Sequence, residues 1–305
     1  MIPRLEERLT GAYAAIPIPF HDDQSLDLDG LGEIIDRVLA RGIRGLTILG
    51  DSAESMTLSD DERYGVLGYA VQRTGGRATI VAGLRSSAAG IAVEQGKRFK
   101  DLGADALLVA LPGRPGALLT GVVAHYTAVV RDVDLPTLYD HAPTDLALSP
   151  EEVGELLTEV TLVGIRNGSR GAADLAEQIR AVGRPISMFT GQSFDCLTCL
   201  AGGGVGAICP IAALMPSTAR RLIDEHRAGN DAGAEDAQSR LLRAAPLVTA
   251  ELHEATAGVP HPGIREALVS VGILRSAMVR GTSAAHMSEE RRQQMRVLGA
   301  ELAEL

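Results

Sequence analysis

The sequence predicts an α/β protein, a (β/α)8 TIM barrel with a C-terminal helical extension. Eight apolar runs of strand length occur in the first two-thirds of the 305 residues. Each run is followed by a segment whose apolar residues recur with helical periodicity. After the eighth run, only the helical pattern continues to the end of the sequence. Eight strand–helix units in a chain of this length indicate a barrel with helices added at its end.

The eight strand candidates are almost continuously apolar and do not alternate between apolar and polar residues. Such runs are typical of strands that are buried on both faces, as in a parallel sheet covered by helices. They are expected at residues 12–17, 45–50, 78–84, 105–111, 136–141, 161–166, 185–190 and 205–209.

The helices between these strands have start and stop signals. Ser59 with Glu62, and Ser149 with Glu152, have the spacing of a capping box, in which each side chain bonds the other residue's backbone. Pro150 suits the first helical position, where no backbone N–H is needed. Helices should stop at Gly42, Gly103 and Gly183. The first helix has an apolar stripe formed by Leu31, Ile34, Ile35, Val38 and Leu39.

The chain is expected to divide into a barrel over residues 1–225 and a helical extension over residues 226–305 that packs on the barrel. Helices are expected at residues 231–255, 263–273 and 288–305. Turns between them are expected at Gly258, at the pair His261-Pro262 and at residues 281–283, because glycine and proline interrupt helices.

Composition excludes several classes of function. Hydrophobic residues make up 46% of the chain, so a large core is available, but aromatic residues make up only 3%. The net charge of −10 argues against nucleic acid or an anionic membrane as a partner. No segment resembles a signal peptide or a membrane helix. Three cysteines cannot all pair within one chain, which favours a reduced, cytoplasmic protein.

Short motifs follow one another at the expected strand ends. Ile16–Phe20 is similar to the pattern hxTPF, Gly50–Leu58 to GTTGExxTL, and Leu138–Pro143 to hYNxP with one residue more. Thr161–Ser169 is similar to hhGhKDsSG. In this order and spacing they resemble the dihydrodipicolinate synthase/N-acetylneuraminate lyase family over nearly the whole chain. The resemblance implies a small oxo-acid substrate and a homotetramer or homodimer, with no metal or other cofactor.

The catalytic lysine of that family is replaced in this sequence. Family members of this pattern form an imine with the lysine of hhGhKDsSG, and Arg166 stands at that position. A guanidinium stays protonated at any working pH and cannot attack a carbonyl. The only lysines, Lys97 and Lys100, lie in a segment expected to be helical. Residues 111–115 also lack the aromatic pair of the family, whose tyrosine some members lend to a neighbouring subunit.

Four residues are candidates for catalysis. Tyr139 matches the proton-shuttling tyrosine of the family, and strand alternation puts His141 on the same face. If both face the barrel mouth, His141 is the better general base near neutral pH. Arg166 would hold a carboxylate or oxyanion, and inside a barrel it needs an anion, either Asp51 or a ligand. Asp51 would otherwise orient His141 or Tyr139, or cap a turn.

Four further residues are candidates for substrate binding, because they match family motifs or lie at strand ends. Ser52 retains one hydroxyl of the family's threonine pair, and Arg85 follows the third strand. Gly191 and Ile208 lie at the ends of strands seven and eight. The pair Cys196 and Cys199 is better explained as buried apolar residues than as a metal or redox site. His125, His226 and His253 are expected on helix surfaces.

Three functions fit these residues. The first is a lyase that acts on a small oxo acid or its adduct, as an aldol-type lyase or synthase or a related hydro-lyase, without a lysine imine. The second is a catalytically silent ligand-binding or assembly protein on a lyase scaffold. The third is a metal-assisted aldolase or hydratase that uses Asp51, Asp140 and His141, although no ligand spacing supports it. New polar groups at several strand ends favour the first.

Overall fold

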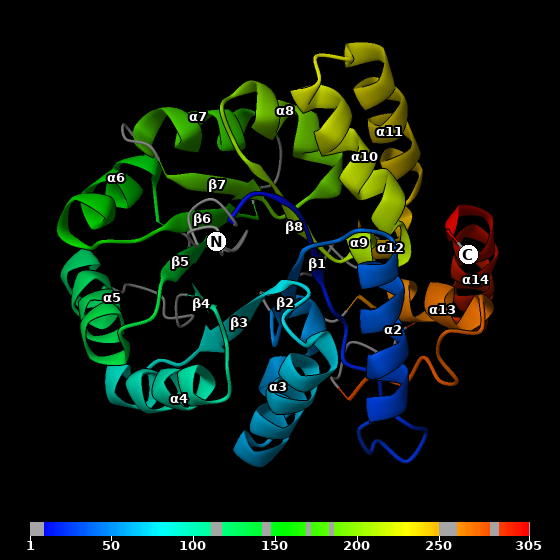
Figure 1. The fold of residues 1–305 in the computed structure, drawn as a ribbon, viewed down its shortest axis with the longest axis horizontal. Coiled ribbons are helices and arrows are strands. Elements are labelled where there is room, and N and C mark those ends of the chain that lie inside the picture. Colours follow the sequence, from blue (N-terminus) through cyan, green and yellow to red (C-terminus); the bar gives the residue numbers. More distant parts are fainter. Residues whose placement is uncertain are drawn as a thin grey trace.

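Eight parallel strands form a closed barrel, as the sequence predicts, with helices around it and an added helical layer on one side (Figure 1). The computed structural model describes residues 9–110, 118–141, 148–168, 172–182, 186–249, 261–280 and 287–304. The strands pair in sequence order, and β8 pairs with β1 to close the barrel. The closure requires Gly206, because a Cβ there would overlap the carbonyl of Gly11.

The strands occupy the eight expected runs, and all but β3 are shorter than predicted. β1 and β2 end two residues early, whereas β5, β7 and β8 begin later than predicted and end where expected. Leu111, expected in strand four, lies outside the described residues. The strands are β1 (Gly11–Ala15), β2 (Gly45–Ile48), β3 (Thr79–Arg85), β4 (Ala106–Ala110), β5 (Thr137–His141), β6 (Gly164–Asn167), β7 (Ser187–Thr190) and β8 (Gly206–Cys209).

The helix signals act as expected. Ser59 and Glu62 form a complete capping box, and so do Ser149 and Glu152, with Pro150 in the first turn. Gly42 and Gly103 adopt positive φ just after their helices, while Gly183 lies outside the described residues. The helices around the barrel are α2 (Leu28–Ala40), α3 (Asp60–Thr74), α4 (Ala89–Asp101), α5 (Leu119–Val133), α6 (Pro150–Glu159), α7 (Ala172–Val182), α8 (Cys196–Ala201), α9 (Ile211–Leu214) and α10 (Pro216–Arg227).

The C-terminal helices are shorter than the sequence predicts. The helix expected over residues 231–255 ends at Arg243, and a separate turn of helix begins at Pro246. Proline disfavours the helical conformation of the residue before it and cannot donate a backbone hydrogen bond. None of the helices in the described ranges is long and apolar enough to cross a membrane. The extension comprises α11 (Asp231–Arg243), α12 (Pro246–Thr249), α13 (Pro262–Ser270) and α14 (Glu289–Leu302).

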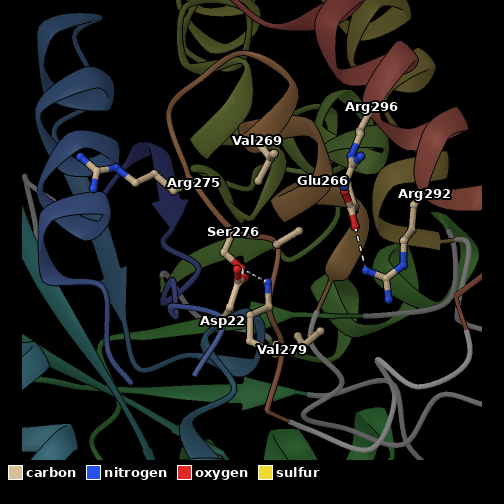
Figure 2. A pocket seen from close by; sticks show the side chains of 10 residues that line it. Asp22, Glu266, Val269, Arg275, Ser276, Val279, Arg292 and Arg296 are labelled. Carbon is tan, nitrogen blue, oxygen red and sulfur yellow. Dashed lines mark hydrogen bonds and ion pairs between the residues drawn. The ribbon is translucent and has the colours of Figure 1, made fainter. Parts of the chain in front are cut away.

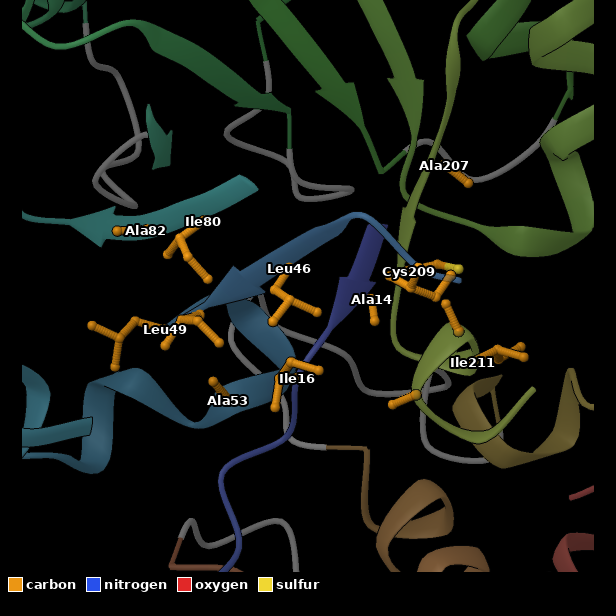
Figure 3. Close-up of a cluster of buried hydrophobic side chains, with 14 of the residues drawn as sticks. Ala14, Ile16, Leu46, Leu49, Ala53, Ile80, Ala82, Ala207, Cys209 and Ile211 are labelled. Carbon is orange, nitrogen blue, oxygen red and sulfur yellow. The ribbon is translucent and has the colours of Figure 1, made fainter. Parts of the chain in front are cut away.

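Two apolar clusters show which way each strand residue faces. The barrel-interior cluster contains Tyr13, Val81, Leu108, Leu138 and Phe189. The helix-facing cluster takes the alternate strand residues, such as Leu46 and Leu107, and joins them to the helices outside. Figure 3 shows part of the helix-facing cluster around Ile16, Leu46 and Cys209. Strand alternation therefore assigns every mouth residue to one of two sides.

A buried ion pair joins the extension to the barrel mouth. Arg265 of α13 lies 3.0 Å from Glu54, and both side chains are almost fully buried. The same guanidinium donates to the carbonyl of Ile18, which follows β1, at 2.9 Å. Glu54 belongs to the loop after β2, directly after the short helix η1 (Asp51–Ala53). The pair therefore fixes a loop of the mouth and the segment after β1 to a helix of the extension.

We predict that Arg265→Met destabilises the protein by about 3–5 kcal/mol, because removing one partner leaves the Glu54 carboxylate buried without its countercharge. The measurement is the free energy of unfolding in urea. A matched control is Arg220→Met, which breaks an exposed pair with Asp224 and should cost no more than about 1 kcal/mol. Equal losses in the two variants would contradict the assignment.

Candidate functional site

A buried ion pair occupies the interior of the barrel at its mouth. Arg166 of β6 and Asp140 of β5 are paired in the register of the sheet, and their side chains meet at 2.8 Å, Nη1 to Oδ1. The Arg166 side chain is 12% exposed and that of Asp140 is 3% exposed. A guanidinium so far from water needs a countercharge, and the structure supplies it from the adjacent strand. Asp140 was not among the anions that the sequence suggested for Arg166, which were Asp51 and a ligand.

The arginine is held by two further strands. Its Nε donates to the carbonyl of Ile208 in β8, at 3.2 Å, which places the guanidinium across the interior. Gly191, after β7, leaves room for it, because a Cβ there would lie 3.0 Å from Cζ and Nη2 of Arg166. Ile208 packs its side chain into the barrel-interior cluster. Gly191 and Ile208, expected to bind substrate, thus both contact Arg166.

Tyr139 and His141 do not face the barrel interior, so the condition on which their expected catalytic roles rested, that both face the mouth, is not met. Tyr139 belongs to the helix-facing cluster, while Leu138 belongs to the interior. The Tyr139 ring meets that of Tyr126 of α5 edge to face, with centroids 5.8 Å apart. Its hydroxyl lies 3.0 Å from Nδ1 of His141. The two residues do share a face, as alternation requires, but it is the face covered by helices.

The sequence contains a signal that assigns the inward position to Asp140. In the pattern YNxP the tyrosine stands three residues before the proline. Three residues before Pro143 is Asp140, so counting from the proline puts Asp140 at the tyrosine position and Tyr139 at the apolar position before it. Pro143 itself lies outside the described residues. Aligning the motif at its tyrosine and aligning it at its proline therefore differ by one residue. A shift of one residue exchanges the two faces of a strand.

The other candidates lie around the same rim. Ser52 is buried in η1, and its hydroxyl has no hydrogen-bond partner in the described part of the chain. The backbone of Asp51 is in η1, but its side chain lies outside the described residues, so its expected role stays a prediction. Arg85 ends β3 on the inward side and is half-buried. Residues 111–115 are not among the described residues.

The cysteines are buried, as expected, whereas one histidine is not where the sequence suggested. Cys196, Cys199 and Cys209 lie in the helix-facing cluster, and burial raises the pKa of each thiol. Within the described ranges, no three His, Cys, Asp or Glu residues are grouped as metal ligands. The expectation that His125 lies on a helix surface is wrong, because it is 6% exposed beside Tyr126.

Comparison with known proteins agrees with the fold and the motifs. Residues 8–301 match the Dihydrodipicolinate synthetase family. A 4-hydroxy-tetrahydrodipicolinate synthase of Anaeromyxobacter dehalogenans is 33% identical over 230 residues, which cover 74% of this chain and 78% of that protein. The synthase of an Exiguobacterium species is 29% identical over 246 residues, 80% and 84% of the two chains.

Solved structures resemble the chain over nearly its whole length. YagE of Escherichia coli, a prophage protein of the dihydrodipicolinic acid synthase family in complex with pyruvate, superposes with a TM-score of 0.87. It is 24% identical, and the match covers 96% of this chain and 98% of YagE. Dihydrodipicolinate synthase of Aquifex aeolicus gives a TM-score of 0.86 at 23% identity, with 96% and 97% of the chains covered. At these identities the likeness concerns the fold.

We predict that Tyr139 makes stability fall at alkaline pH. Burial, and to a lesser extent the Asp140 carboxylate, raise the pKa of the Tyr139 phenol in the folded chain. The unfolded chain releases this proton at a pH of about 10. The contribution to stability is therefore complete below pH ~10 and is lost as the pH rises toward the higher folded pKa.

The measurement is the unfolding free energy against pH for the wild type and Tyr139→Phe. The variant should lose about 1 kcal/mol at neutral pH, the usual value of one hydrogen bond, but depend less on pH above ~10. Val129→Ala, in the same buried cluster, removes no titrating group and is the control that should keep the wild-type slope. An unchanged slope in Tyr139→Phe would contradict the prediction.

Proposed function

Because the chain belongs to the Dihydrodipicolinate synthetase family, we propose that it is a lyase that acts on a small oxo acid or its adduct without a lysine imine. The observation that carries the proposal is the Arg166–Asp140 pair, which stands inside the mouth at the lysine position of the family motif. The pair brings a fixed positive charge and a carboxylate to the end of the barrel where enzymes of this fold work.

The two lysines of the chain support a mechanism without an imine. Both lie on α4, outside the barrel, and both are exposed. Lys97 pairs with Glu94 on the same helix, and Lys100 pairs with Asp134 after α5. Neither ammonium group can reach a carbonyl held near Arg166, because the wall of strands lies between them.

In the proposed reaction Arg166 binds the substrate carboxylate or the oxyanion that develops next to it. Charge-assisted, bidentate bonds would lower the energy of an enolate-like transition state, as a protonated imine does in the family. A substrate carboxylate that bonds to Arg166 would displace Asp140 from the guanidinium. Asp140 would then accept the proton from the carbon next to the carbonyl, or return one to it. Ser52, Arg85 and Asp51 would contact the rest of the substrate.

We propose that Tyr139 and His141 position the Arg166–Asp140 pair and do not contact the substrate. Their hydrogen bond lies on the opposite face of β5 and keeps the end of this strand in place. The carbonyl of His141 accepts from the N–H of Gly168 at 2.7 Å, so the same strand end also orients the turn after β6. They are positioning residues in this proposal, and the mouth chemistry belongs to Asp140 and Arg166.

A silent ligand-binding or assembly protein remains the second candidate. The observation in its favour is that Arg166 has a carboxylate and a carbonyl as partners within the chain itself. In that case oxo acids would bind without turnover. We also propose a homo-oligomer, as the family resemblance implies, although one solved neighbour is described as a monomeric dihydrodipicolinate synthase variant.

The first test is chemical trapping. Incubation with pyruvate and borohydride should leave the intact mass unchanged, because a guanidinium cannot form the imine that borohydride reduces. Arg166→Lys is the informative comparison, since it restores an amine at the position. A reduced adduct on the wild-type chain at Lys97 or Lys100 that tracks with loss of activity would refute the proposal.

The second test is kinetic, with a substrate found by thermal-shift screening of 2-oxo acids and assayed for release or consumption of pyruvate. We predict that Asp140→Asn lowers kcat by about 100-fold, the usual scale for an acid–base group, with a smaller change in KM. Arg166→Gln should raise KM and lower kcat together. Tyr139→Phe is the control and should change kcat by less than about 10-fold. Full activity in Asp140→Asn would refute the mechanism. If the wild-type protein bound 2-oxo acids but turned none of them over, the result would favour the silent protein.

A further inference from the structure

A second cavity lies away from the barrel mouth, between the extension and the segment that returns from it (Figure 2). Its volume is about 250 Å³. The walls come from α13, from α14, from residues 275–279 and from Asp22 in the loop after β1. The size is just below the usual range of ligand pockets and suits a small organic molecule. No part of the proposed reaction uses it.

The polar wall of this cavity contains one carboxylate and two arginines. Glu266 of α13 is 2% exposed, and each of its oxygens bonds a different arginine of α14. Arg292 lies 3.3 Å from Oε1, and Arg296 lies 2.7 Å from Oε2. The two arginines are four residues apart, so they stand on one face of the helix. One buried negative charge is therefore matched by two positive charges.

Asp22 also lines the cavity, so the lining carries two carboxylates and three arginines, a net charge of +1. Asp22 accepts a hydrogen bond from Ser276. Arg275 extends away from Glu266 in Figure 2, so Arg292 and Arg296 are the arginines beside that carboxylate. Among the described residues, the Nη atoms of Arg296 have no hydrogen-bond partner, since only its Nε bonds Glu266. About two-thirds of each arginine side chain is covered, which weakens screening by water.

The apolar wall of the cavity is formed by Val269, Met278 and Val279. A cationic wall and an apolar wall around one small space match a molecule with a charged head and an apolar body. In a chain with a net charge of −10, a lining with a net charge of +1 is against the general trend. We propose that this cavity binds a small organic carboxylate, with its head on Arg292 and Arg296 and its body on the three apolar side chains.

The test uses benzoate as the probe and the neutral benzamide as the matched control, at constant ionic strength. Carbon-13 labelling of the methionine methyl groups places a reporter on Met278 in the apolar wall. We expect benzoate, and not benzamide, to shift the Met278 signal in a saturable way. Arg296→Gln should weaken benzoate binding by about 10-fold or more, the loss expected for a charge-assisted bond.

Arg291→Gln is the control variant, because Arg291 lies on the same helix but pairs with Gln294. It should bind benzoate as the wild type does. A Met278 signal unmoved by millimolar benzoate, or equal shifts with benzamide, would overturn the proposal. Should Arg296→Gln fail to fold, the wild-type titration and Arg292→Gln decide the question. If benzoate bound at the barrel mouth instead, the Met278 signal would not move, and benzoate binding would be lost in Arg166→Gln.

Discussion

The pair between Arg166 and Asp140 is the constraint on which the barrel mouth depends. A guanidinium inside a closed barrel costs several kcal/mol unless a carboxylate and carbonyls replace the water it loses. β5 supplies the carboxylate, β8 supplies the carbonyl of Ile208, and the chain after β7 supplies the space at Gly191. Positions 140 and 166 are therefore coupled, because changing either one alone leaves the other charged and buried.

This coupling explains why a chain of the family can keep its barrel while the lysine position carries a different base. Arg166 keeps a charged side chain at the end of β6 and has its countercharge on the neighbouring strand. A decayed site would more simply have taken apolar residues at both positions, since buried ion pairs are often less stable than packed hydrophobes. The retention of two opposite charges at the working end of the barrel is what favours a functional mouth.

The sequence predicts the barrel well and the mouth less well, for a physical reason. Apolar runs and helix caps are local, so the eight strands and both capping boxes could be predicted from neighbouring residues. The partner of Arg166 could not, because Asp140 is 26 residues away and meets it only through strand pairing. A shift of one residue in the tyrosine motif was enough to exchange Tyr139 and Asp140 between the two faces of β5. Pro246 is itself a sequence signal for the end of a helix, but the helical periodicity of residues 231–255 favoured one continuous helix.

The extension takes part in shaping the mouth. Arg265 of α13 holds Glu54 in the loop that carries Ser52, and Arg280 bonds Glu62 at the start of α3 and places its guanidinium over the Phe20 ring. The next residue on α13 after Arg265 is Glu266, which gathers the two arginines of the second cavity. One helix therefore presents a charged side chain toward the mouth loop and, one residue later, another toward α14. Because Arg265 and Glu266 are both buried, a displacement of this helix would strain the loop around Ser52 and the second cavity together.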